Sequence, residues 1–207
     1  MAEASPAPFK FIAGNAALDF VNSVSGWIAG APRGDYLDSY GDLVAWGVDA
    51  GLVAPRAAKR LLAEAARQPR AAAQALSRAV ALRDTLHRLF AALAQGRPPA
   101  RADLEAVNAG IGDALARQRL VRRGDGFAWD WDGAPALDRV LWPVLRAAAD
   151  LLTSGRLGRV RECGGERCHW LFLDETKNAS RRWCDMSVCG NRAKARRHYD
   201  RSHGRAG

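Results

Sequence analysis

The chain has 207 residues, with 31 Lys or Arg and 22 Asp or Glu, so its formal net charge is +9. This length allows one large domain, or one domain with a small module attached. The sequence contains neither a run of eighteen apolar residues nor a basic segment followed by an apolar one at its start, which argues against membrane-spanning and secreted classes. We therefore expect a soluble, cytoplasmic protein.

The first part of the chain carries the signals of short helices. Apolar residues at helical spacing predict a short helix over residues 16–24, with polar residues embedded in it. Ser39 and Asp42 form a capping-box pattern for a second helix, which Gly51 is expected to end. Pro55 suits the first turn of a third helix.

Stronger periodicity follows. Apolar stripes predict long helices over residues 70–95 and 104–115. Residues 119–131 favour a small hairpin, because the turn-forming segment 124–126 separates two short strand-like runs. A last helix is predicted from Leu137 to about Gly155. The fold class expected is mainly α, with this hairpin interrupting the helices.

All four cysteines lie near the end of the chain, in the pattern Cys-x4-Cys-x15-Cys-x4-Cys: Cys163, Cys168, Cys184 and Cys189. Two close pairs separated by about fifteen residues suit one tetrahedral, structural Zn²⁺, since each pair can offer two thiolates from one turn. Two disulfides or four unrelated thiols are the alternatives. His169 is a further candidate ligand, and a zinc-bound thiolate can also serve as a redox sensor.

The residues between and after these cysteines predict a treble-clef-like finger. Residues 169–174 have strand-forming side chains, and residues 181–184 are expected to return beside them. Asp185 or Ser187 can then cap a helix that continues through residues 189–199. A knuckle, a hairpin and a helix that carries a ligand follow one another in the order of a treble clef.

Positive charge is concentrated in this module. From Arg156 onward the chain holds 13 of its Lys and Arg residues and 6 of its acidic residues, a net +7 of the total +9. Such clustering points to a polyanionic partner, with duplex DNA as the favoured nucleic acid. The candidate contacts are Arg181, Arg182, Asn191, Arg192, Lys194, Arg196, Arg197 and Arg201. Asn191 and Arg192 can equally support the zinc site, because both lie within three residues of Cys189.

Two alternatives to DNA binding stay open. RNA binding would use the same charges but needs exposed aromatic rings, whereas Trp170 and Trp183 are expected to pack inside the small finger. A protein-interaction module would need an apolar groove. No Ser/His/Asp arrangement, nucleotide loop or His-Glu-x-x-His pattern is found in the sequence, so we do not expect an enzyme.

The finger resembles the CGNR zinc finger family, whose name matches Cys189-Gly-Asn-Arg192 here. Trp170-Leu-Phe-Leu-Asp174, Arg181-Arg-Trp-Cys-Asp-Met186 and Arg192-Ala-Lys-Ala-Arg-Arg197 are similar to the same family. Leu18-Asp-Phe-Val-Asn-Ser23 looks like the opening motif of the helical ABATE domain that commonly precedes such fingers. The resemblance implies a transcription regulator with a DNA-binding finger.

We accordingly expect an ABATE-like helical domain over residues 1–154, a linker over 155–158 and a zinc finger with a basic tail over 159–207. Polar residues within the helical domain raise a further possibility. Asp19, Asn22 and Trp46 are candidates for a pocket that binds a small-molecule effector. Capping and buried hydrogen bonds are the alternative explanation of the two polar residues. A homodimer is also compatible with the sequence.

Overall fold

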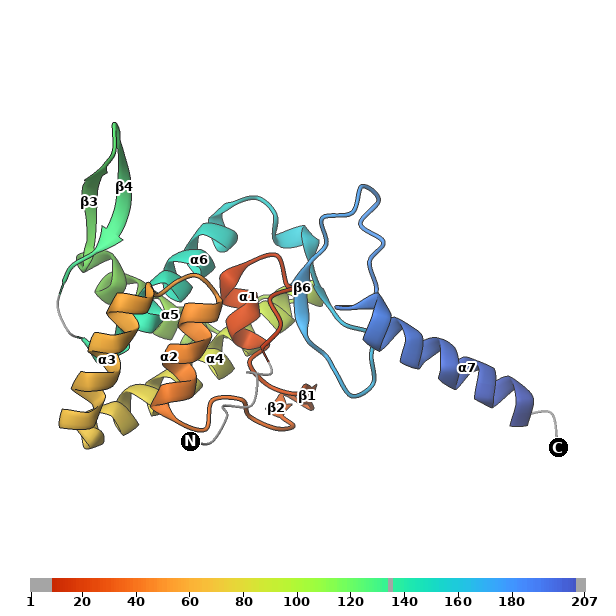
Figure 1. The fold of residues 1–207 in the computed structure, drawn as a ribbon. Coiled ribbons are helices and arrows are strands. Elements are labelled where there is room, and N and C mark those ends of the chain that lie inside the picture. The colour runs from red at the N-terminus through yellow and green to blue at the C-terminus, as the bar shows by residue number, and fades with distance from the viewer. Residues whose placement is uncertain (1–8, 134–135, 204–207) are drawn as a thin grey trace.

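The computed structural model describes residues 9–133 and 136–203 and is built mainly from helices (Figure 1). Its α-helices are α1 (Ala16–Val21), α2 (Tyr40–Asp49), α3 (Pro55–Arg67), α4 (Pro69–Ala94), α5 (Arg101–Ala116), α6 (Leu141–Thr153) and α7 (Asn191–His203). None of the helices in these two ranges is long and apolar enough to cross a bilayer.

Three two-stranded antiparallel sheets and three short irregular helices complete the described fold. The strands are β1 (Trp27–Ile28), β2 (Ala31–Pro32), β3 (Gln118–Arg123), β4 (Gly126–Trp131), β5 (Val160–Glu162) and β6 (Leu171–Leu173), paired as β1–β2, β3–β4 and β5–β6. The short helices are η1 (Leu137–Val140), η2 (Leu157–Arg159) and η3 (Met186–Gly190). The mainly α architecture predicted from the sequence is confirmed.

Local signals fixed the boundaries of α2 as predicted. The Ser39 Oγ accepts a hydrogen bond from the Asp42 backbone N at 3.1 Å, and the Asp42 carboxylate accepts one from the Ser39 backbone N at 2.8 Å. Gly51 lies just beyond the helix with φ of +70°, in the left-handed region that glycine adopts readily. Pro55 is the first residue of α3.

The first helix is shorter than the sequence predicted. The helix expected over residues 16–24 ends at Val21, because the backbone that follows is used in extended pairing. Val24 forms a bridge with Asp35, and its carbonyl accepts a hydrogen bond from the Trp170 indole N at 2.9 Å. At the other end, the side chain of Asn15 caps the helix by accepting from the Ala17 backbone N at 2.9 Å.

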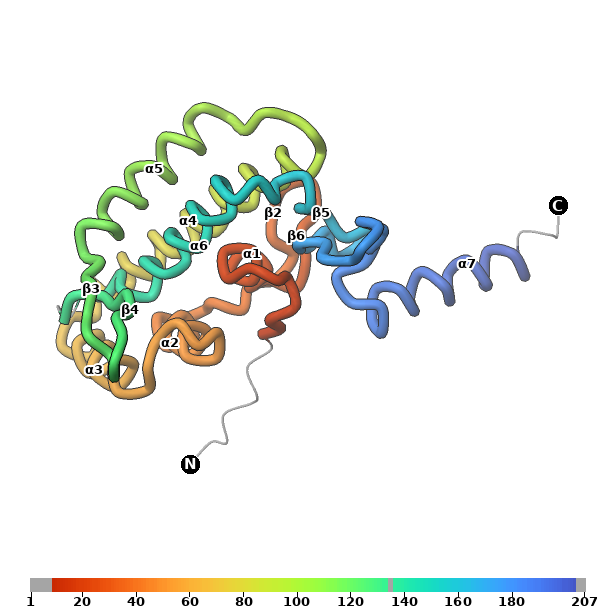
Figure 2. Tube along the Cα trace, turned by 90° about the horizontal axis from the view of Figure 1, so that it is seen from above, coloured from red at the N-terminus to blue at the C-terminus, as the bar shows by residue number. Residues whose placement is uncertain are grey.

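α1 lies at the centre of the molecule, against α4, α6 and β6 (Figure 2). Five of its six residues are buried, and the Phe20 ring meets the Trp46 ring edge-on with centroids 4.9 Å apart. The surrounding hydrophobic core is continuous from Ala13 to Cys189. The helical part and the cysteine-rich part therefore share one core.

Hydrogen bonds to backbone groups of the cysteine-rich part join it to the helical part. The Asn22 side chain donates to the Leu171 carbonyl at 2.8 Å and accepts from the Leu171 N at 3.0 Å. The Trp27 N donates to the Cys168 carbonyl at 2.8 Å. Gly26 permits this approach, because a Cβ there would lie 2.4 Å from the Arg167 carbonyl oxygen. The proposed division at residues 155–158 stays a prediction.

The pairing of the finger's strands corrects a prediction. Residues 169–174 were expected to pair with residues 181–184, but β6 pairs with β5, and no strand forms over 181–184. The other edge of β6 is already occupied, because the Leu173 N donates to the Ala13 carbonyl at 2.8 Å and Asn22 bonds to Leu171. Residues 181–184 have no free edge to join.

The predicted hairpin of β3 and β4 is confirmed and stands away from the helices (Figure 1). Leu120 lies opposite Trp129, and Arg122 lies opposite Phe127, so these four side chains share one face. Leu120, Phe127 and Trp129 are all more than half exposed. The homodimer that the sequence allows stays a prediction.

The pocket expected from Asp19, Asn22 and Trp46 is also corrected. The side chains of all three residues are buried in the core, and Trp46 is only 1% exposed. The Asp19 carboxylate accepts a hydrogen bond from the Ala13 N at 2.9 Å, and both polar atoms of the Asn22 amide are bonded to Leu171. These groups hold the fold together instead of facing a ligand.

Burial raises the pKa of Asp19 to about 6, against 3.8 for an exposed aspartate. The folded state thus favours the protonated acid, so the associated stabilisation is present in acid and is lost as the pH rises through 6. We expect Asp19→Asn to remove about 1.4 kcal/mol of pH dependence between pH 5 and 7.5, measured by urea unfolding. Equal pH dependence in both proteins would contradict this assignment.

Asn22→Ala should destabilise the protein by about 2–4 kcal/mol, because the N–H and the carbonyl of Leu171 would both lose a buried partner. Asn108→Ala, on the exposed surface of α5, is the matched control and should change stability little. Denaturant unfolding of the two variants measures the difference. If both variants unfold like the unmodified protein, Asn22 does not hold the finger to the helices.

Candidate metal centre and nucleic-acid interface

The first two cysteines lie in the turn between β5 and β6. The Cys163 N donates to the Trp170 carbonyl at 2.8 Å, which continues the ladder of the two strands into the turn. The Cys168 N donates to the Gly165 carbonyl at 2.8 Å and closes a tight loop. A Cβ on Gly165 would lie 3.4 Å from the Cys189 sulfur. Because glycine has no side chain, the loop can pass close to the sulfurs at this position.

The second pair lies at the start of the C-terminal helical segment. The Cys184 N donates to the Cys163 sulfur at 3.3 Å, and Cys189 belongs to η3, a single wide turn that leads into α7. Asp185, one of the two capping residues predicted, caps this turn. Its carboxylate accepts hydrogen bonds from the Ser187 N at 2.8 Å and from the Ser187 hydroxyl at 2.6 Å.

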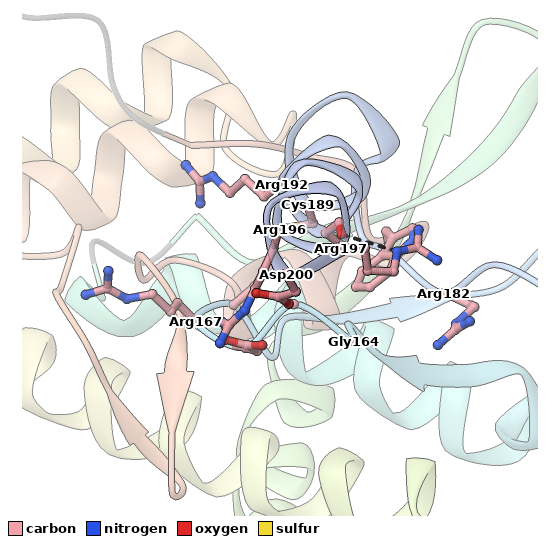
Figure 3. Close-up of a pocket in the computed structure, with 13 residues that line it drawn as sticks. Gly164, Arg167, Arg182, Cys189, Arg192, Arg196, Arg197 and Asp200 are labelled. Carbon is pink, nitrogen blue, oxygen red and sulfur yellow. Dashed lines mark hydrogen bonds and ion pairs between the residues drawn. The ribbon is translucent and has the colours of Figure 1, made fainter. Parts of the chain in front are cut away.

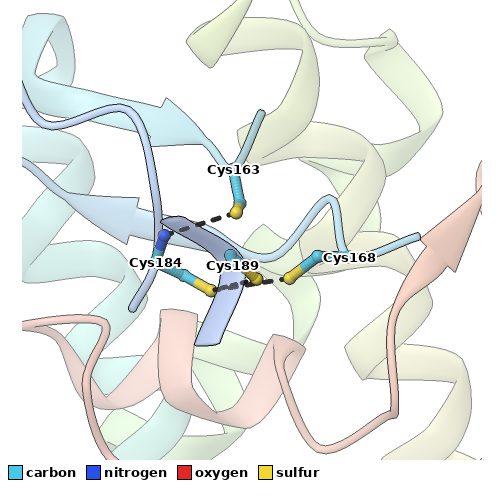
Figure 4. A group of neighbouring side chains, drawn as sticks. All are labelled: Cys163, Cys168, Cys184 and Cys189. Atoms are coloured by element: carbon cyan, nitrogen blue, oxygen red, sulfur yellow. Dashed lines mark hydrogen bonds between the residues drawn. The ribbon is translucent and has the colours of Figure 1, made fainter. Parts of the chain in front are cut away.

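The four sulfurs converge, although 25 residues lie between the first cysteine and the last (Figure 4). All lie within 4.8 Å of one another, with 3.5 Å between the sulfurs of Cys168 and Cys184 and 3.6 Å between those of Cys184 and Cys189. Tetrahedral zinc with bonds of about 2.3 Å needs sulfurs about 3.8 Å apart, which these side chains match closely. All four are free thiols and not disulfides.

His169, the alternative ligand, is not among the side chains that converge, since the potential metal-binding group in the described residues consists of the four cysteines. Its Nδ1 lies 2.6 Å from the Glu162 carboxylate. Protons on the sulfurs also bear on metal binding. The contacts of Cys184 with the sulfurs of Cys163 and Cys168 raise the pKa of its thiol, and burial adds to this effect. A bound divalent cation stabilises the thiolates, so the thiols release protons as the site takes up metal. The affinity of the site for metal must therefore fall in acid.

α7 begins directly beyond this cluster and buries none of its residues. It points away from the helical body in both views (Figures 1 and 2). Lys194 and Arg201, two of the predicted nucleic-acid contacts, are exposed along it. A helix that buries no residue and carries this charge leaves its side chains open to solvent.

A groove of about 350 Å³ runs between the base of α7 and the loop of the first cysteine pair (Figure 3). Five arginines line it: Arg167, Arg182, Arg192, Arg196 and Arg197. Two acids share the groove, Asp200 and Glu166, and Glu166 pairs with Arg196. The groove therefore keeps a surplus of positive charge.

The side chains of two other predicted contacts bond to backbone carbonyls of the chain itself. The Arg181 guanidinium lies 4.3 Å from the Phe172 ring centroid and donates to the carbonyls of Trp183 at 3.0 Å and Ile12 at 3.2 Å. It ties the finger to the chain's N-terminal segment. The Asn191 side chain donates to the Ser187 carbonyl at 3.0 Å, across the first turn of the helical segment.

Arg192 is exposed, as Asn191 is, and lines the groove. Its contact with DNA stays a prediction, as does its support of the zinc site. Arg167 was not identified from the sequence. It lies between the first two cysteines, and only the folded loop shows that this position faces α7.

Comparison with family models gives two adjacent matches. The ABATE model, described as "Putative stress-induced transcription regulator", matches residues 14–155, and the CGNR zinc finger model matches residues 159–202. A search among curated proteins finds no match. The matched finger and the four converging thiols together support one structural zinc ion per chain.

Cys184→Ser should abolish stoichiometric zinc and lower the melting temperature of the whole chain, because β6 belongs to the core shared with α1. Structural zinc contributes on the order of 10 kcal/mol to folding in small modules. Metal analysis and circular dichroism melts measure the two effects, with Ser180→Ala, at an exposed position, as the control. One zinc per chain and an unchanged melt in Cys184→Ser would contradict this role of the sulfur.

Proposed function

We propose, on the premise that this chain belongs to the ABATE family and carries a CGNR zinc finger, that it regulates transcription by binding duplex DNA. The observation that carries the proposal is the convergence of five arginines on one groove beside an exposed helix. They come from the first cysteine loop, the loop before Cys184 and α7. Phosphate oxygens are the partners that such guanidinium groups bind best.

The placement of the charges suits a duplex. An α-helix fits the major groove of DNA, and α7 is exposed over its whole length. Lys194 and Arg201 are exposed on α7 outside the lining of the groove and extend the cationic surface. Cys189 lies just before the helix, so the zinc site fixes the base from which α7 projects. In this proposal, the groove and the outer part of α7 contact phosphates together.

The aromatic residues of the finger give less support to single-stranded RNA. Trp170 is buried, and its indole N is bonded to the Val24 carbonyl. Trp183 is half-buried and packs over Gly164, where a Cβ would lie 3.2 Å from its ring. Rings placed in this way serve packing, whereas RNA-binding modules stack bases on exposed ones.

We further propose that the protein is not an enzyme at its zinc site. Four cysteine ligands complete a tetrahedral coordination sphere and leave no position for water or substrate. The metal in this proposal positions α7 relative to the rest of the finger.

Replacing Lys194, Arg196, Arg197 and Arg201 with glutamine should weaken binding to duplex DNA without loss of zinc, because these side chains lie beyond the ligand-bearing turn. If they neutralise about four phosphates, the slope of log K against log salt should be less steep by about 3.6 in the variant than in the unmodified protein. Arg167, Arg182 and Arg192 remain in the variant and keep the rest of the salt dependence. Competition with duplex DNA and single-stranded RNA at several salt concentrations measures both quantities.

The matched control replaces Arg56, Lys59, Arg60 and Arg70 with glutamine, which removes the same charge from exposed positions of α3 and α4. It should retain DNA binding and most of the salt dependence. The proposal is wrong if the two quadruple variants bind duplex DNA equally well at low salt. Preference for single-stranded RNA over duplex would instead favour the RNA-binding alternative.

A further inference from the structure

A second cavity lies where the helical part meets the finger. Its volume is about 580 Å³, which is within the range of small-molecule sites. α4, the segment from Arg97 to Asp103, the β1–β2 turn and the finger all contribute to its lining. From the finger come Glu162 and His169, which lie next to the zinc ligands Cys163 and Cys168.

A stacked pair of rings lies at the inner side of this cavity. The rings of Trp27 and His87 are parallel within 6°, with centroids 3.7 Å apart, and the two residues are only 1% and 5% exposed. The Trp27 indole N and the His87 Nδ1 are buried and find no hydrogen-bond partner in the described parts of the chain. Burial lowers the pKa of His87 to about 4, so its ring is uncharged at neutral pH.

Unpartnered buried polar atoms are uncommon in folded proteins and cost free energy, so their presence at a cavity calls for a function. This neutral, stacked pair forms an aromatic inner wall of the cavity, although little of either ring is exposed. Half of the other lining residues are small and apolar: Ala29, Gly30, Ala91, Ala92, Pro98 and Ala100. Such walls leave room for a flat ring system beside them.

The charged groups of the cavity indicate whether its ligand carries a positive or a negative charge. Asp103 is neutralised by Arg88, with 2.6 Å between the guanidinium and the carboxylate. Glu162 accepts from the Gln95 amide at 2.9 Å and contacts His169 at 2.6 Å. The Arg97 guanidinium donates to the Gln95 amide oxygen at 2.5 Å. It has no other hydrogen bond and no ion pair among residues 9–133 and 136–203.

We propose that this cavity binds a small planar aromatic carboxylate, with its ring system against Trp27 and His87 and its carboxylate on Arg97. Both acids of the cavity have partners, so a cationic ligand would find no free carboxylate. A guanidinium group bonded only to an amide gains most from a carboxylate, which it can bind through two hydrogen bonds.

The same contacts connect the site to the finger. Arg97 is bonded to Gln95, Gln95 to Glu162, and Glu162 to His169, which is next to Cys168. A carboxylate on Arg97 competes with the Gln95 amide for the guanidinium and so acts on the first member of this chain. The proposed site thereby links ligand binding to the loop that holds two zinc ligands, whether or not the finger binds DNA.

Titration calorimetry of the zinc-loaded, full-length protein tests the site, with indole-3-carboxylate as the probe and the uncharged indole-3-carboxamide for comparison. We expect a Kd of about 1 mM or tighter for the carboxylate, given the binding energy per atom usual for ligands of this size. The carboxamide should bind about tenfold more weakly, because the charge-assisted bond to Arg97 is lost. Arg97→Gln should weaken carboxylate binding by a similar factor.

Arg101→Gln is the matched control: its side chain is exposed at the start of α5, pairs with Glu105 and does not line the cavity. It should bind the probe like the unmodified protein. Ala91→Leu, which fills the cavity, should abolish binding while its circular dichroism melt stays normal. The site is refuted if the probe does not bind at 5 mM, or if Arg97→Gln and Arg101→Gln bind it equally.

The link to the finger has a separate readout, the rate of zinc transfer to a chelator. Saturating indole-3-carboxylate should change this rate at least about twofold in the unmodified protein and not in Arg97→Gln. An unchanged rate in a protein that binds the probe would refute the link. Neither measurement involves nucleic acid, so its failure is distinguishable from failure of the proposed DNA binding.

Discussion

The hydrogen bonding of β6 on both of its edges determines how the rest of the structure is arranged. One edge pairs with β5, and the other is bonded to Asn22 and to the Ala13 carbonyl. A strand held on both sides cannot rotate relative to α1, so the orientation of the whole finger is fixed by the core. The finger therefore packs on the helical part through one continuous hydrophobic core.

From β6 outward, each element positions the next. The β5–β6 turn carries the first two thiols, and the sulfurs bring in Cys184 and Cys189. Because Cys189 lies in the turn before α7, the metal sets the direction in which that helix leaves the body. The core thus orients the metal site, and the metal site orients the cationic surface that we propose for DNA.

Patterns that depend on near neighbours could be predicted from the sequence. The capping box at Ser39, the β3–β4 hairpin and the clustering of the cysteines all follow from local spacing or ligand chemistry. Predictions failed where a distant segment decides the outcome. Residues 181–184 have strand-forming character, but Asn22 and Ala13, far away in sequence, already occupy the edge they would need. Arg181 could not be distinguished from its exposed neighbour Arg182, because only tertiary contacts with Phe172 and Ile12 separate them. The cavity beside Trp27 and His87 combines residues from four segments and leaves no pattern in the sequence.

The absence of buried residues in α7 has a consequence for how recognition can diverge. Substitutions in a packed helix are limited by the shape of its neighbours, but exposed positions of α7 are limited only by helix propensity and by the partner. In the DNA-binding role that we propose for α7, sequence changes along this helix can alter the target without a cost to the core. The arrangement separates the evolution of specificity from the maintenance of the fold, and it makes α7 the segment to exchange when the protein is to be redirected to another target.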